Sequence, residues 1–181
     1  MYLPSDGDDE LIRRCLEGEP DAFEGLVAKY QKPLYHVAFR LLGNRPDATD
    51  ATQNAFVSAY EHLDSFDSGR RFFSWIFRIL KNECLNFLRA RRPSEPVDPD
   101  LAARGRPDDA LDTAERERAV QAALLKLSSD YRDVVVLRHF AELSYDDIAA
   151  TLGIPVKTVK SRLYSARQHL GELLADWQTK R

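Results

Sequence analysis

Residues 143–170 read "LSYDDIAATLGIPVKTVKSRLYSARQHL", and this stretch is the clearest indication of the fold of the C-terminal half of the chain. Ser144 is a good N-cap for a short helix, and Gly153 is typical of the residue that ends one. The turn "GIP" then leads into a second helix from Val156 onward. Apolar residues recur at helical spacing in both segments, which predicts two helices packed on a common core. This pattern is typical of a helix-turn-helix, whose second helix enters the major groove of DNA.

Positive charge is concentrated on that second helix, although the chain as a whole is acidic, with 26 Lys and Arg against 29 Asp and Glu. No Asp or Glu occurs between Ile148 and Gly171. With the apolar residues turned inward, the outward or flanking positions are Lys157, Thr158, Lys160, Ser161, Arg162, Tyr164 and Arg167. Contacts of Lys and Arg with phosphates release counterions, so this face predicts salt-dependent DNA binding. The alternative is an ordinary amphipathic hairpin whose charges are solvated.

A second basic segment covers residues 70–92, where Glu83 is the single acid. The residues that share one face of the predicted helix there are Trp75, Arg78, Asn82, Asn86 and Arg89. A polar loop, "SFDSGRR", comes just before this helix. Bases stack on aromatic rings while arginines follow the backbone, so the combination favours single-stranded nucleic acid. The alternative is that the aromatic residues only fill the core.

The whole chain is predicted to be all-α, with two small helical domains. The predicted helices cover approximately residues 11–16, 20–42, 45–63, 71–92, 113–127, 130–141, 144–152 and 156–170. Between the two sets, residues 93–112 carry four prolines and many acids, which indicates a semi-extended linker. We therefore expect an N-terminal domain over residues 1–92 and a C-terminal domain over residues 113–181, with Thr113 as the N-cap of its first helix.

Several classes of protein are disfavoured. No run of apolar residues is long enough for a membrane helix, and the acidic N-terminus lacks the apolar core of a signal peptide, so we expect a cytoplasmic protein without membrane insertion. Cys15 and Cys84 are expected to be reduced thiols. The four histidines are scattered, at His36, His62, His139 and His169. With no nucleophile, metal-binding spacing or phosphate-binding glycine loop beside them, we expect no catalysis, no metal and no cofactor.

Four segments, in this order, resemble the extracytoplasmic-function (ECF) sigma factors, the small two-domain members of the sigma-70 class of bacterial RNA polymerase. They are "GEPDAFEGLVAKYQKPLYHVAFRLLGN", "DATDATQNAFVSAYEHL", "FFSWIFRILKNECLNFLRARR" and the helix-turn-helix quoted above. The resemblance covers nearly the whole chain. It implies a non-enzymatic subunit that binds core RNA polymerase and directs initiation at specific promoters.

The resemblance also implies roles for individual residues. Those matching the surface that docks on a coiled coil of the largest polymerase subunit are Asp50, Gln53 and Asn54. Those matching the elements that open and hold the -10 promoter region are Phe66, Asp67, Arg70, Arg71, Trp75, Arg78 and Asn82. The -35 element would be read by the outward face of the second helix of the helix-turn-helix, with Ser165 added to it. The family pattern usually has an arginine at Ser165 and acids at Thr49 and Asn54.

Three other functions remain open at this point. A stand-alone helix-turn-helix regulator would bind a symmetric operator as a dimer. A helical nuclease or hydrolase would need metal ligands, for which Asp50 and Glu83 are the available acids. An interaction protein would keep the fold without reading DNA. In the family an anti-sigma protein often holds the factor inactive, and the sequence leaves open whether this chain has such a partner.

Overall fold

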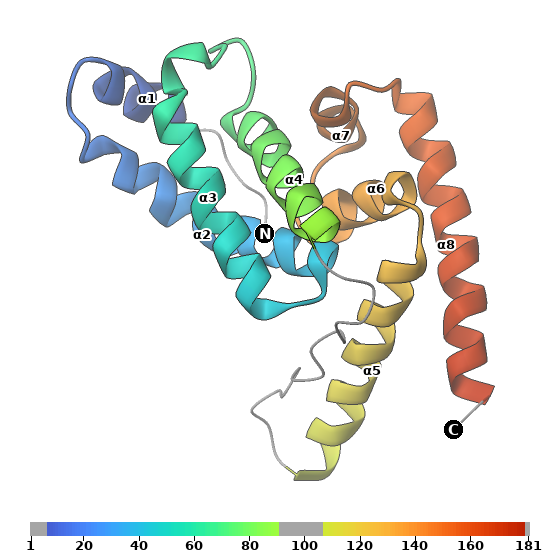
Figure 1. Cartoon of the computed structure of the whole chain (residues 1–181). Coiled ribbons are helices and arrows are strands. Elements are labelled where there is room, and N and C mark those ends of the chain that lie inside the picture. The colour runs from blue at the N-terminus through green and yellow to red at the C-terminus, as the bar shows by residue number, and fades with distance from the viewer. Residues whose placement is uncertain (1–6, 91–106, 180–181) are drawn as a thin grey trace.

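The computed structural model describes residues 7–90 and 107–179 of the chain, and it is helical throughout that part, with no strand. In chain order the elements are α1 (Asp8–Leu16), α2 (Ala22–Leu42), α3 (Arg45–Glu61), the short 3-10 helix η1 (Leu63–Ser65), α4 (Phe72–Ala90), α5 (Pro107–Lys126), α6 (Ser129–His139), α7 (Tyr145–Leu152) and α8 (Val156–Thr179) (Figure 1). The predicted all-α class is confirmed.

Helix α3 is built to lie close to its neighbours. The Asn44 side chain caps it by accepting a hydrogen bond from the Asp47 amide at 3.0 Å, and a proline lies in its first turn. Its inward residues are small and fully buried, namely Ala48, Ala51, Ala55 and Ala59. Because these side chains are short, the α3 backbone packs closely against both α2 and α4.

Helix α4 has one apolar face, and the predicted inward residues Phe73, Ile76, Phe77, Leu80 and Cys84 are all buried. Burial raises the pKa of the Cys84 thiol to about 12, which keeps it protonated and unreactive at neutral pH. Both cysteines are free thiols, as expected from the sequence.

The C-terminal half begins earlier than the sequence indicated. Helix α5 starts at Pro107, inside the segment 93–112 that was predicted to be a linker. Proline is compatible with the first turn of a helix, because its missing N–H would have no partner there. Thr113 therefore lies within α5 and is not its N-cap. The remainder of the predicted linker, residues 91–106, lies outside the described residues.

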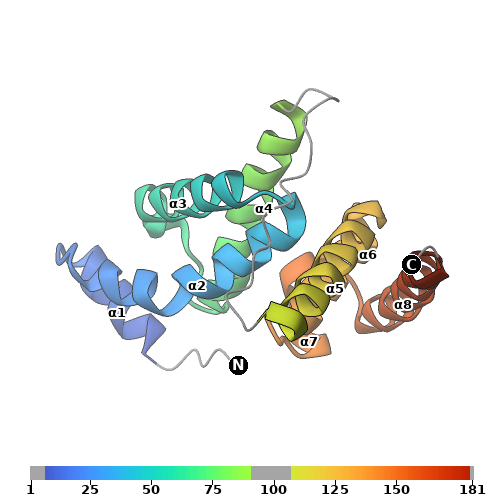
Figure 2. The ribbon, with the colours of Figure 1, turned by 90° about the horizontal axis from the view of Figure 1, so that it is seen from below.

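The two halves pack against each other around a continuous hydrophobic core. Helix α2 contacts α5 and α6, and α4 contacts α7, so the N-terminal helices α2 and α4 form one side of the junction. Figure 2 shows α5 and α6 beside the end of α2, with α8 on the far side of the C-terminal half. Because α7 contacts both α4 and α8, this packing places the two basic segments of the sequence, on α4 and α8, on either side of α7.

Candidate nucleic-acid interface

The helix-turn-helix consists of α7 and α8. The Ser144 hydroxyl accepts a hydrogen bond from the Asp147 amide at 3.1 Å, which caps α7 as the sequence predicted. Gly153, at φ 67°, ends the helix in the left-handed region that favours glycine. Three residues of α8 are buried and hold it in place: Val159, Leu163 and Ala166. This burial fixes which face of α8 points outward.

The outward face of α8 carries most of the predicted -35 residues. Those that are exposed are Lys157, Lys160, Ser161, Tyr164 and Arg167, whereas Thr158, Arg162 and Ser165 are half-buried. Tyr164 is 67% exposed, so its ring and hydroxyl group are accessible to a partner. Lys160 lies 6.0 Å from the centre of the Tyr145 ring.

Arg162 differs from the other basic residues of this face. Its guanidinium is paired with the carboxylate of Asp130 at 2.5 Å, so it ties α8 to the start of α6. Sequence periodicity placed Arg162 outward, but it gave no sign of this ion pair, because Asp130 lies 32 residues away. Arg162 is therefore positioned by α6 at the edge of the face.

The second predicted site begins at the loop before α4. The Phe66 ring packs edge-on against Trp75, with 5.3 Å between ring centres, and both side chains are partly buried. Asp67 shapes the loop, because its carboxylate accepts a hydrogen bond from the Gly69 amide at 3.0 Å and lies 3.3 Å from Arg70. The site therefore combines an aromatic pair with an ordered polar loop.

The remaining predicted residues of this site lie on α4 and just before it. Asn82 is exposed. Arg78 donates hydrogen bonds to the carbonyl oxygens of Ala150 and Thr151, at 2.8 and 2.9 Å. Arg71 forms an ion pair with Asp147 at 3.0 Å. Two of the predicted -10 residues are thus bonded to α7 of the other half of the chain.

An open pocket of about 510 Å³ lies at this junction. It is lined by Gly69, Arg70, Arg71, Ser74, Trp75, Arg78, Asp147, Ala150 and Gly153. The lining combines three arginines with an indole, a set of groups that suits an anionic, aromatic ligand such as a nucleotide unit. One carboxylate, that of Asp147, already offsets part of the positive charge.

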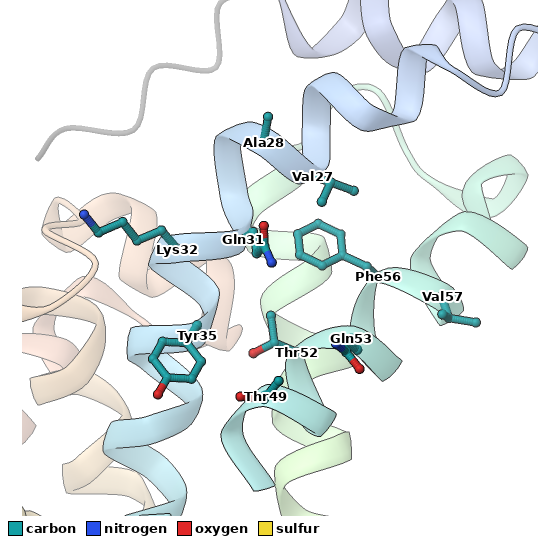
Figure 3. A pocket seen from close by; sticks show the side chains of 10 residues that line it. All are labelled: Val27, Ala28, Gln31, Lys32, Tyr35, Thr49, Thr52, Gln53, Phe56 and Val57. Carbon is teal, nitrogen blue, oxygen red and sulfur yellow. The ribbon is translucent and has the colours of Figure 1, made fainter. Parts of the chain in front are cut away.

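The predicted polymerase-docking residues Asp50, Gln53 and Asn54 are all exposed on α3. Beside them a groove of about 660 Å³ runs between α2 and α3 (Figure 3). Gln53 and Val57 line it from α3, and Val27 lines it from α2. Val57 is 57% exposed, so an apolar surface adjoins the polar one. The polar residues alone do not indicate this groove, although Val57, an apolar residue four positions after Gln53, was a visible signal in the sequence.

Among the residues that the structure describes, no three His, Cys, Asp or Glu side chains gather in a way that could hold a metal ion. Asp50, one of the two acids considered as metal ligands, lies on the exposed face of α3. None of the helices over residues 7–90 and 107–179 is long and apolar enough to cross a membrane.

Comparison with known families supports the two-part organisation. Residues 26–93 match the family model for Sigma-70 region 2, and residues 117–170 match that for Sigma-70 region 4. Among curated relatives, the ECF RNA polymerase sigma factor SigW of Bacillus subtilis is 35% identical over 91% of this chain and 95% of its own. The RNA polymerase sigma-H factor of Pseudomonas aeruginosa is 33% identical over 95% of this chain and 96% of its own.

Solved structures that are similar to this chain also include sigma factors. CnrH, in complex with the cytosolic domain of CnrY, has a TM-score of 0.75 and 32% identity, over 94% of this chain and 99% of that chain. The sigma factor RpoE of Bartonella quintana, in complex with the anti-sigma factor NepR, has a TM-score of 0.65 and 28% identity, over 84% of this chain and 96% of that one. The chain therefore belongs to the ECF sigma factors of the sigma-70 family.

Proposed function

We propose that this chain binds core RNA polymerase and directs initiation by reading the -35 element as duplex DNA with α8 and holding the -10 element with α4 and the preceding loop. The observation that carries the proposal is the exposed basic face of α8 over residues 156–170, a stretch without Asp or Glu, in a chain whose other half bears a separate face of arginines and aromatic rings. The two faces differ in chemistry, as binding of duplex and of melted DNA requires.

At the -35 element, Lys157, Lys160 and Arg167 are suited to contact phosphates, because their charges are exposed along one side of α8. Ser161, Tyr164 and Ser165 offer hydroxyl groups that donate and accept hydrogen bonds at base edges. Ser165 makes this set less basic than the family pattern, so we expect base preferences at its contact position to be weaker. Thr158 and Arg162 complete the face from half-buried positions.

At the -10 element, Phe66 and Trp75 offer rings on which unstacked bases can pack. Arg70, Arg71 and Arg78 are suited to neutralise the backbone of the melted strand. Asp67 and Asn82 bring polar atoms to the same region, where extruded bases are read by hydrogen bonds.

Docking on the polymerase is assigned to Asp50, Gln53 and Asn54. A coiled coil presents a polar flank beside an apolar seam, and α3 presents a polar row beside an apolar groove that includes Val57. We propose that the coiled coil of the largest subunit lies along this row, with its apolar side chains over the groove.

The remaining features follow from this role. We propose that the protein works in the cytoplasm, where polymerase and promoter DNA are found, without catalysis, cofactor or membrane insertion. The solved relatives CnrH and RpoE are bound to CnrY and to the anti-sigma factor NepR, respectively. We therefore also propose that an anti-sigma protein binds this chain.

Single substitutions separate the two interactions. We expect Asp50→Ala to weaken co-elution with core polymerase in size-exclusion chromatography and to leave duplex DNA binding unchanged. We expect Lys160→Ala to do the reverse. The matched controls are Glu172→Ala and Arg118→Ala, which remove an exposed acid and an exposed base that are not among the residues assigned to either interaction.

Two outcomes would contradict these assignments. If both variants behaved like the wild type, the site residues would be wrong even though the family is known. If the chain bound a palindromic duplex as a dimer and did not co-elute with polymerase, it would act as a stand-alone regulator.

A further inference from the structure

The junction between the two halves of the chain covers residues that the proposed function needs for DNA. Arg78 is held by two backbone carbonyls from the last turn of α7, and Arg71 by the Asp147 carboxylate. Between them, the hydroxyls of Ser74 and Thr151 lie 2.7 Å apart in a buried hydrogen bond. Helix α7 therefore sits directly on the face of α4 that carries Arg78.

The groups that α7 presents to this face resemble those of a nucleic-acid backbone. The last carbonyls of a helix lack intrahelical partners and carry the negative end of the helix dipole. The Asp147 carboxylate adds a full negative charge at 3.0 Å from Arg71. Arginine forms strong hydrogen bonds with carboxylate and phosphate oxygens alike, so α7 and a DNA strand would compete for the same side chains.

Other contacts hold the junction in the same arrangement. Lys81 of α4 forms an ion pair with Asp133 of α6, which is only 4% exposed. Arg132 donates to the Leu41 carbonyl at 3.1 Å, and Arg40 donates to the Gln121 side chain at 3.0 Å. The junction thus combines these polar contacts with the shared apolar core, and polar contacts of this kind are typical of interfaces between domains of one chain.

The -35 face is not part of this junction. Lys157, Lys160 and Tyr164 remain exposed on α8 while Arg71 and Arg78 are engaged by α7. In this closed arrangement the chain therefore presents one of its two DNA faces and covers part of the other.

We propose that α7 occupies the single-strand-binding face of α4 in the free chain, so that the chain inhibits its own -10 binding until the two halves separate. This inference rests on the proposed function, because it takes α4 to be a single-strand-binding face. The apparent affinity for single strands then falls in proportion to the fraction of molecules that are open. Binding of duplex DNA by α8 does not depend on that fraction.

A reversible disulfide tests the proposal. The variant Ser74→Cys/Thr151→Cys, in a Cys15→Ser/Cys84→Ala background, places two thiols where two hydroxyls now touch. Its oxidised and reduced forms are compared for binding to fluorescent random-sequence 20-nucleotide single strands and to a random-sequence duplex. The reduced form of the same protein is the matched control.

We expect oxidation to lower single-strand affinity by at least about tenfold, to leave duplex affinity unchanged, and to be reversed by reduction. Equal single-strand binding by the two forms would overturn self-inhibition, as would failure of the disulfide to form. Loss of binding to both probes in both forms would instead overturn the proposed DNA-binding function, and the inference with it.

A second variant opens the junction instead of locking it. Thr151→Glu places a charge against Ser74 in the buried contact, whereas Thr151→Val keeps the shape and serves as its control. We expect the Glu variant to bind single strands more tightly than the wild type, although its added charge is negative. Unchanged duplex binding would show that α7 and α8 are still folded. A single-strand affinity equal to that of the wild type would contradict the proposal.

Discussion

The two basic faces of this sigma factor differ in how far a neighbouring helix covers them. On α8, Lys157 and Lys160 are exposed, whereas on the α4 side Arg71 and Arg78 are bonded to α7. Helix α7 lies between the two faces, because it contacts α8 within the helix-turn-helix and contacts α4 across the junction. A basic residue of this chain is therefore fully available to DNA only where no carboxylate or carbonyl oxygen of the protein already binds it.

The largest effect is expected from Leu163→Ala, which removes a buried side chain from beneath the exposed face of α8. A cavity of this kind lowers the free energy of unfolding by about 2–5 kcal/mol. The neighbouring Tyr164→Ala alters the exposed side of the same helix and should change stability by less than about 0.5 kcal/mol. Denaturant unfolding of both variants measures the difference. Equal losses would mean that α8 does not have the inner and outer faces described here.

Lys81→Ala breaks the junction on the α4 side. It leaves the buried Asp133 carboxylate without its cation, and we expect a loss of about 1–2 kcal/mol, reduced because the Lys81 side chain is 30% exposed. Chemical denaturation measures this loss, with the exposed Lys126→Ala as the control.

The Lys81→Ala loss should depend on pH. Burial raises the pKa of Asp133, and Lys81 opposes that rise, so the variant has a still higher pKa in the folded state. A folded-state pKa above the unfolded value means that the penalty is present at neutral pH and shrinks as the pH falls through the raised pKa. A loss that grew on acidification would contradict the assigned ion pair.

Ser144→Ala removes the N-cap of α7, the helix that serves both faces. We expect a loss of about 1 kcal/mol in unfolding free energy. Asn44→Ala removes the equivalent cap of α3 and should cost a similar amount. Only the Ser144 variant should also change the balance between single-strand and duplex binding, as measured by fluorescence anisotropy. If both variants left that balance unchanged, α7 would not link the two faces.

The smallest effect is expected from Lys157→Ala, on the exposed face of α8. Loss of one phosphate contact should reduce the slope of log affinity for duplex DNA against log salt by about 1. Titrations of the variant and of Arg118→Ala at several salt concentrations measure the slope. A slope unchanged from that of the wild type would remove Lys157 from the phosphate-binding set.

Local patterns in the sequence were sufficient for the helices and for the outward face of α8. Ser144 and Gly153 marked the ends of α7, and the spacing of Val159, Leu163 and Ala166 gave the inward side of α8. Local rules failed at Pro107, because prolines that suggest a linker are equally compatible with the first turn of a helix.

Contacts between residues that lie far apart in the sequence could not be predicted from such local patterns. The pairing of Arg162 with Asp130 and of Arg78 with the end of α7 depends on how whole helices pack. Charge patterning identified both arginines as basic and outward, but it contains no information on which acceptors the fold brings to them. The roles of the individual site residues stay predictions for the same reason.

The most direct measurement is run-off transcription by core RNA polymerase from a library of genomic DNA fragments, with and without this protein. We expect new transcripts that depend on the protein and whose start sites share two upstream sequence elements at a constant spacing. Transcripts no more abundant or specific than those from core polymerase alone would contradict a promoter-directing role.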